Sequence, residues 1–194
     1  MASTASLTEL AASAGEAHNF IVQSLLRGSK TKTRRTPPAA DKVLAQLRDA
    51  AKLSKKDSDQ LSQIVTLATG KSTRPLAERA AEIQQIDATL QRKAAAVDPL
   101  VLAISSIAND SATTALAMPA PGKNGHKSKV LVKELIDGAA VVGADVLGAL
   151  IGGALAIKAG KSKNVVVQVA VALGSAASAS VRDGDGFPTN ISVD

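Results

Sequence analysis

Few side chains in this sequence are of the types that perform catalysis. The histidines are His18, which lies between Ala14 and Ile21 on an apolar face, and His126, in a segment rich in lysine and glycine. Neither has a nucleophile or a second metal-ligating residue at the spacing that such sites need. Cysteine is absent, which excludes disulfides and thiolate-bound metals. We therefore predict a protein that is not an enzyme and that holds no cofactor.

Two glycine patterns were compared with known ligand-binding loops. The sequence Asp183-Gly184-Asp185-Gly186 resembles the beginning of a calcium loop, but the later ligands and the closing glutamate are missing. No glycines are spaced as in the phosphate-binding motifs that follow a strand. We predict a turn at residues 183–186 and no metal site.

The positive charge of the chain is concentrated near one segment. The net charge is +6, and residues 27–35 hold five basic residues and no acidic one. Nucleic-acid sites of this kind usually interleave aromatic residues or align basic ones along a helix. We predict a solvated, flexible linker over residues 28–39. The alternative is contact with the phosphates of an anionic lipid or of a nucleic acid, through Lys30, Lys32, Arg34 and Arg35.

The remaining candidate for function is the apolar segment 139–160. Small residues recur there at every fourth position, which allows a partner helix to approach closely. This pattern predicts helix association, and hence a homo-oligomer, through Ala140, Ala144, Gly148, Gly152 and Ala156. Asp145 and, eight residues earlier, Asp137 lie on nearly the same side and mark a polar face. We expect Asp145 to face a pore, to pair with a lysine, or to lie in an interface between helices in water.

The same segment has the length of a membrane span. Residues 138–157 would extend about 30 Å as a helix, the thickness of the hydrocarbon core of a bilayer. Lysines lie on both sides and could reach the headgroups, among them Lys133 and Lys158. Against insertion, one aspartate at the centre of a bilayer costs roughly 3 kcal/mol. The length and the flanking lysines favour a bilayer as a partner.

The elements that would position this segment are helical. Apolar residues recur at helical spacing in residues 4–27, 39–54 and 57–69. A longer helix is predicted from Thr73, with a kink or restart at Asp98–Pro99, where Asp98 would be the cap. Its apolar residues at seven-residue intervals are Leu76, Ile83, Leu90, Val97 and Ile104.

Composition then divides the chain. Residues 1–110 are predicted to form an amphipathic helical bundle, 111–129 a linker rich in proline and glycine, and 130–194 an apolar region. The last begins with a Gly/Ala-rich helix from about residue 130 to 157. Valines alternate over residues 164–173 and favour a C-terminal β-hairpin, whereas a membrane would accept residues 165–181 as a second apolar helix. The predicted fold class is mainly α.

Two functions fit these patterns. The first is a membrane-inserting, oligomerising protein of the pore- or channel-forming type. In outline it resembles the apolar hairpins of toxins and of phage proteins that penetrate envelopes. The second is a self-assembling structural protein of a shell, filament or virion, which the scarcity of aromatic residues also fits. A monomeric bundle with a Gly/Ala-rich core helix is the third interpretation. No secretory signal is visible at the N-terminus, and we expect the protein at a membrane or within a particle.

Overall fold

A computed structural model of the chain describes Glu9 and residues 11–17, 40–69, 74–117, 138–158, 169, 171–172 and 174–176. This part of the protein is mainly helical, as the sequence predicts, and its helices pack as a bundle. The elements are α3 (Ala40–Ala51), α4 (Lys55–Ala68), α5 (Leu76–Gln91), the 3-10 turn η1 (Ala94–Ala96), α6 (Pro99–Ala117) and α7 (Gly138–Lys158).

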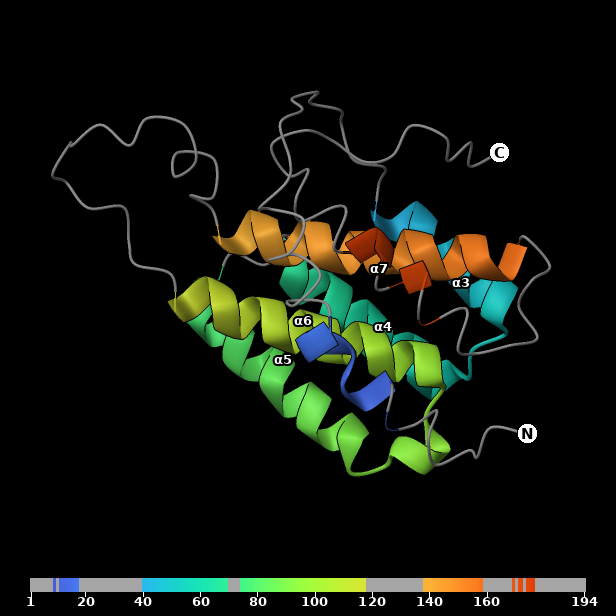
Figure 1. Ribbon diagram of the computed structural model, residues 1–194, viewed down its shortest axis with the longest axis horizontal. Helices are drawn as coiled ribbons and strands as arrows, with labels where there is room; N and C mark the ends of the chain where they lie inside the picture. The colour runs from blue at the N-terminus through green and yellow to red at the C-terminus, as the bar shows by residue number, and fades with distance from the viewer. Residues whose placement is uncertain are drawn as a thin grey trace, which may run out of the picture.

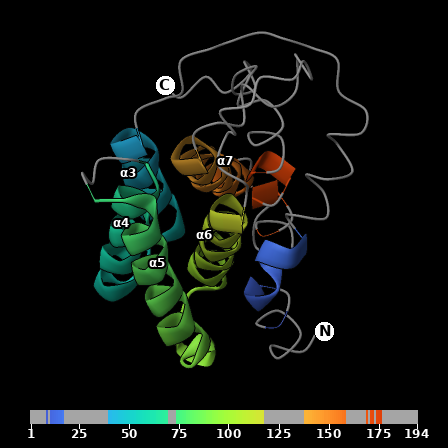
Figure 2. The same ribbon diagram turned by 90° about the vertical axis from the view of Figure 1, so that its left-hand side faces the viewer.

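The helices form three layers. Helices α6 and α7 run side by side in the middle and in opposite directions, with α3, α4 and α5 on one side of them (Figure 1, Figure 2). On the other side lie the helical residues 11–17 and the described residues of the segment 169–176 (Figure 2). The two apolar helices are therefore covered on both faces.

The corner between α3 and α4 is built from local signals. Lys52 adopts a left-handed conformation with φ of 52°, and the amide of Leu53 donates to the Arg48 carbonyl at 3.4 Å. This pair of features ends α3 as a Schellman motif does. Ser54 then begins α4, since its Oγ accepts from the Asp57 amide at 3.1 Å. The Arg48 guanidinium also donates to Ser62 Oγ on α4, which connects the two helices.

The predicted long helix from Thr73 consists of two helices. Helix α5 ends at Gln91, and the chain reverses through η1 before α6 begins at Pro99. The predicted restart is confirmed, because Asp98 Oδ1 accepts from the Leu100 amide at 2.9 Å. Most of the residues at seven-residue intervals are buried: Ile83, Leu90, Val97 and Ile104. Their spacing reflects burial on two antiparallel helices instead of one continuous stripe.

Two predictions about the second half of the chain need adjustment. Helix α6 continues to Ala117, into the segment 111–129 that was expected to be a linker, because no proline or glycine interrupts it before Pro119. In residues 164–182 the sequence allowed a β-hairpin or a helix. The described residues there (169, 171–172 and 174–176) are helical, and no strand occurs in the part of the chain that the structure describes.

Candidate functional site

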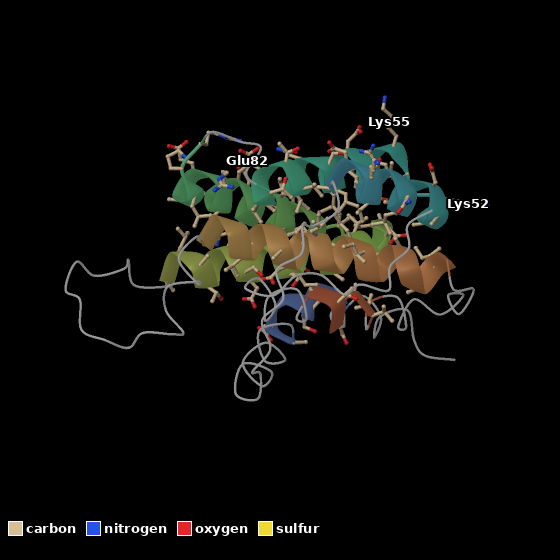
Figure 3. The ribbon with its side chains drawn as sticks, turned by 90° about the horizontal axis from the view of Figure 1, so that it is seen from above. Lys52, Lys55 and Glu82 are labelled. Carbon is tan, nitrogen blue, oxygen red and sulfur yellow. The ribbon has the colours of Figure 1, made fainter. Side chains whose placement is uncertain are left out.

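Helix α7 lies in the middle of the bundle, where α3, α4 and α6 pack against it. Every residue from Ala144 to Gly153 is buried. Of the charged side chains of the outer layer, Lys55 and Glu82 lie on the side of α4 and α5 away from α7 (Figure 3), whereas Asp57, Arg79 and Asp87 are buried. The middle of the most apolar helix is therefore shielded from water.

The predicted helix-association residues lie along this buried helix. Ala144, Gly148, Gly152 and Ala156 are buried within the chain, and Ala140 lies in the first turn of α7. Association between copies through these residues stays a prediction. Of the other predicted site residues, Asp145 is described in the structure, and the rest lie outside the described residues: Asp137, Lys30, Lys32, Arg34 and Arg35.

Asp145 is the buried carboxylate of α7, with 1% of its surface exposed. Its Oδ2 accepts a hydrogen bond of 2.5 Å from the hydroxyl of Ser111 on α6, and Ser111 is also buried. In the structure Asp145 lies between two helices of one chain, α6 and α7, and its facing a pore or pairing with a lysine stays a prediction. The bond from Ser111 is a polar link between α7 and α6.

Glycines allow the neighbours of α7 to approach its backbone. A Cβ built on Gly152 would lie 2.6 Å from both the Val171 carbonyl oxygen and Ser175 Oγ. On the opposite side, a Cβ on Gly143 would lie 3.2 Å from the carbonyl oxygen of Ala68 in α4. Such distances are shorter than ordinary van der Waals contact, so close approach depends on the missing side chains. These glycines serve contacts within the chain.

The N-terminal segment covers α6 by a similar close contact. Ser106 Oγ of α6 donates to the Ala12 carbonyl at 2.9 Å and accepts from the Gly15 amide at 2.9 Å. A Cβ on Gly15 would lie 2.5 Å from the Ser106 carbonyl oxygen. Gln91 of α5 adds a hydrogen bond of 3.3 Å to Ala12. Ser106 thus fixes residues 11–17 on the apolar helix by two hydrogen bonds, and Gln91 adds a third.

Two carboxyl groups beside α6 have raised pKa values. Burial raises the pKa of Asp87, an effect opposed by the polar side chains of Ser105, Gln91 and Asn109 beside it, of which the Asn109 amide donates to Asp87 Oδ2 at 3.3 Å. Burial also raises the pKa of Asp98; its hydrogen bond from the Leu100 amide opposes this, and the nearby Asp57 carboxylate adds to the rise. Asp87 contacts amide and hydroxyl groups and Asp98 caps a helix, so both have structural partners.

The outer layer contains an open groove of about 610 Å³ between α4 and α5. It is lined by amides, carboxylates and small side chains, among them Gln60, Gln63, Glu78 and Gln85. At its wall, the hydrogen bond from Gln63 and then the Arg74 guanidinium, 2.6 Å from Glu82, lower the pKa of Glu82. Its lining includes no histidine, lysine or serine, and the hydroxyl of Thr89 in the lining donates to the Gln85 carbonyl at 2.8 Å within α5. Within the described ranges, no three metal-ligating side chains of His, Asp or Glu gather at one place.

Helix α6 also has the composition of a membrane span, which the sequence reasoning missed. Among the described residues, Pro99–Ala117 is the one helix long and apolar enough to cross a bilayer, and most of it is buried in the protein. The described apolar part of α7 is shorter, Val141–Ala154. The core helix of a bundle passes the same test.

Comparisons with protein families, with curated protein sequences and with solved structures find no match. The class that the geometry defines is a helical bundle around an antiparallel pair of apolar helices, with one buried carboxylate at their interface.

Ser111 is the residue of this site that sequence reasoning missed. It was assigned to a linker because prolines and glycines follow soon after it. A signal was present in the sequence: Ala108, Ala112 and Ala115 continue the helical spacing of apolar residues past it, and all three are buried.

Proposed function

We propose that this protein inserts into lipid bilayers and associates there with copies of itself, forming a pore or channel. The observation that carries the proposal is the position of α7: a helix of small and aliphatic residues, enclosed by a layer of amphipathic helices. In this form the apolar surface is kept from water. In a bilayer the same apolar surface would contact lipid, and α7 would no longer need other helices to shield it from water.

The polar groups of α7 are compatible with this proposal. Asp145 is its one charged residue before Lys158, and Ser111 already donates a hydrogen bond to it. The glycines of α7 cost helix stability in water, about 1 kcal/mol each relative to alanine. In a membrane they would permit close contact between helices. Helices associate there through van der Waals packing at small residues, because the hydrophobic effect does not act between them.

The C-terminal segment would follow α7 as a second apolar helix. Support comes from the helical conformation of Val171 and Ala172 and from their neighbours at 174–176. Val169 is buried, as the inward side of such a helix would be. A hairpin of strands would instead require these residues to be extended.

Flotation and dye release test the proposal. Purified protein is mixed with vesicles of phosphatidylcholine and phosphatidylglycerol that contain a self-quenching dye, and is then floated on a density gradient. We expect the protein to rise with the vesicles and to release the dye. Protein that remains at the bottom and releases no dye contradicts the proposal. Large particles in lipid-free buffer, detected by light scattering, would instead favour a self-assembling structural protein.

A further inference from the structure

The two central helices are similar in length and composition and run in opposite directions. Helix α6 has Asp110 as its one charged residue, and α7 has Asp145 and the terminal Lys158. They run antiparallel, and the chain between them spans residues 118–137. An antiparallel pair of this kind is a hairpin. At about 1.5 Å per residue, the 19 residues of α6 extend about 28 Å and the 21 residues of α7 about 31 Å.

Contacts at two levels hold the pair together. In the middle, the Ser111 hydroxyl donates to Asp145 at 2.5 Å. Near the beginning of α6, the Leu100 side chain lies against Gly153 of α7, where an added Cβ would be 2.9 Å from Leu100 Cδ2. The interface therefore combines a buried hydrogen bond with close packing on a glycine, as stable helix pairs in membranes do.

The contacts that α4 and residues 11–17 make with the two central helices differ from the interface between α6 and α7. Helix α4 meets α7 at Gly143 through the end of α4, at Ala68 and Thr69. Residues 11–17 meet α6 through the Ser106 hydroxyl. The outer helices α3 and α4 are amphipathic. Their polar faces are already in water, and the departure of α7 would uncover part of their apolar faces, a cost that insertion of α6 and α7 into lipid has to exceed.

The energetics favour keeping the pair intact. An aspartate that entered a bilayer alone would cost roughly 3 kcal/mol. With Ser111 beside it, part of its hydrogen-bonding need is already met. We propose that α6 and α7 enter the bilayer together as an antiparallel hairpin, with Asp145 still bonded to Ser111, while α3, α4 and α5 separate from them. This inference rests on the proposed function and specifies its inserting unit.

Engineered disulfides test which interface opens, and the chain has no native cysteine to interfere. The pair Leu100→Cys with Gly153→Cys links α6 to α7, and it removes the leucine atoms that a new Cβ would meet. The pair Thr69→Cys with Gly143→Cys links α4 to α7, where the Cβ of residue 143 would lie 3.5 Å from the Cα of Thr69. In both pairs the Cβ position of the glycine lies within 3.5 Å of an atom of the partner residue. Mass spectrometry confirms each bond, and circular dichroism confirms that each variant is helical.

The two links have opposite expected effects on dye release. The oxidised α6–α7 link should leave release within about twofold of the reduced form. The oxidised α4–α7 link should reduce release at least tenfold, and a thiol reductant should restore it. Loss of release with the α6–α7 link, or full release with the α4–α7 link, overturns the inference alone. If the wild-type protein releases no dye, the proposed function fails and the inference fails with it.

A labelling experiment serves if either disulfide does not form. Thr113 is exposed on α6, and Lys55 is exposed at the beginning of α4 (Figure 3). Each is replaced singly by cysteine and labelled with an environment-sensitive dye. On addition of vesicles, we expect a blue shift and quenching by lipid-bound quenchers for Thr113→Cys, and neither for Lys55→Cys. Labels that behave alike at the two positions contradict insertion of α6 with α7.

Discussion

The carboxylate of Asp145 is shielded from water and accepts a hydrogen bond from Ser111. The free-energy cost of burying it therefore depends on the protein groups around it. Removing one partner of a buried hydrogen bond to a charged group usually costs more than the bond itself contributes. The sequence marked Asp145 as the residue that should not face lipid. The structure adds that its partner comes from the preceding helix.

Ser111→Ala should lower the free energy of unfolding by about 1–3 kcal/mol, because a buried carboxylate loses a hydrogen bond. Thr113→Ala is the control on the same helix. Thr113 is exposed, and its Oγ1 donates to the carbonyl of Asn109 in the same helix at 2.9 Å. The control should change stability by less than about 0.5 kcal/mol. Urea unfolding followed by circular dichroism measures both, and equal effects would contradict the role of Ser111.

Asp98→Asn should raise the melting temperature at neutral pH. Because the pKa of Asp98 is raised in the folded state, its ionised form opposes folding, and this cost appears as the pH rises through that pKa. Asparagine removes the charge and still accepts from the Leu100 amide. The gain at pH 7 should therefore shrink as the pH falls towards about 3, where the native carboxyl is protonated. A gain that is constant with pH would contradict this account.

Lys52→Gly should stabilise the protein by about 0.5–1 kcal/mol, because Lys52 has a positive φ that glycine adopts without strain. Lys52 lies at the end of α3 (Figure 3), so the new residue removes no buried contact. Ala45→Gly, at an exposed position inside the same helix, is the matched control and should cost about 1 kcal/mol. Thermal unfolding of the two variants should give shifts of opposite sign.

At the scale of elements, the pattern of apolar residues predicted most helices well. The helical spacing within residues 39–54 places Val43, Leu44, Leu47 and Ala51 on one face. In α3 the first three are buried and Ala51 is partly buried. Partners of buried polar groups could not be predicted, because Ser111 and Asp145 are 34 residues apart. The packing of α7 against three helices depends on tertiary geometry that no local spacing encodes. The membrane-span length of α6 was overlooked because its serines and Asn109 interrupt the apolar run.

Gly152→Ala tests whether close packing on α7 determines stability. Alanine normally stabilises a helix by up to about 1 kcal/mol relative to glycine. At position 152 the added methyl would meet the Val171 carbonyl and Ser175, so we expect a net loss of about 1–3 kcal/mol. Gly174→Ala is the control, since nothing lies within 4 Å of its Cβ position. Unfolding of Gly152→Ala at or above the wild-type denaturant midpoint would contradict the packing role.

At the scale of the whole molecule, the distribution of charge suggests how the protein would meet a membrane. We predict that the basic segment 28–39 attracts anionic lipid, where each basic residue contributes about 1 kcal/mol near the surface. The test variant replaces four basic residues by glutamine: Lys30, Lys32, Arg34 and Arg35. Its partition into vesicles that contain phosphatidylglycerol should fall by about tenfold or more, measured by co-sedimentation at low salt.

A control with the same loss of charge separates position from net charge. It replaces four exposed lysines of the outer layer by glutamine: Lys42, Lys52, Lys55 and Lys56. We expect this variant to bind the vesicles more tightly than the first one does. Equal partition of the two variants would show that only net charge matters, and would remove the basic segment as a lipid contact.

The serine that fixes the N-terminal segment on α6 also has a consequence for synthesis. Gly15 and Ser106 are 91 residues apart, so residues 11–17 leave the ribosome long before their binding surface exists. Contacts of such sequence separation form late, after local helices have paired. We expect the N-terminal segment to dock near the end of folding. In a nascent chain that is released before residue 106 has been added, residues 11–17 lack the surface of α6 that they bind.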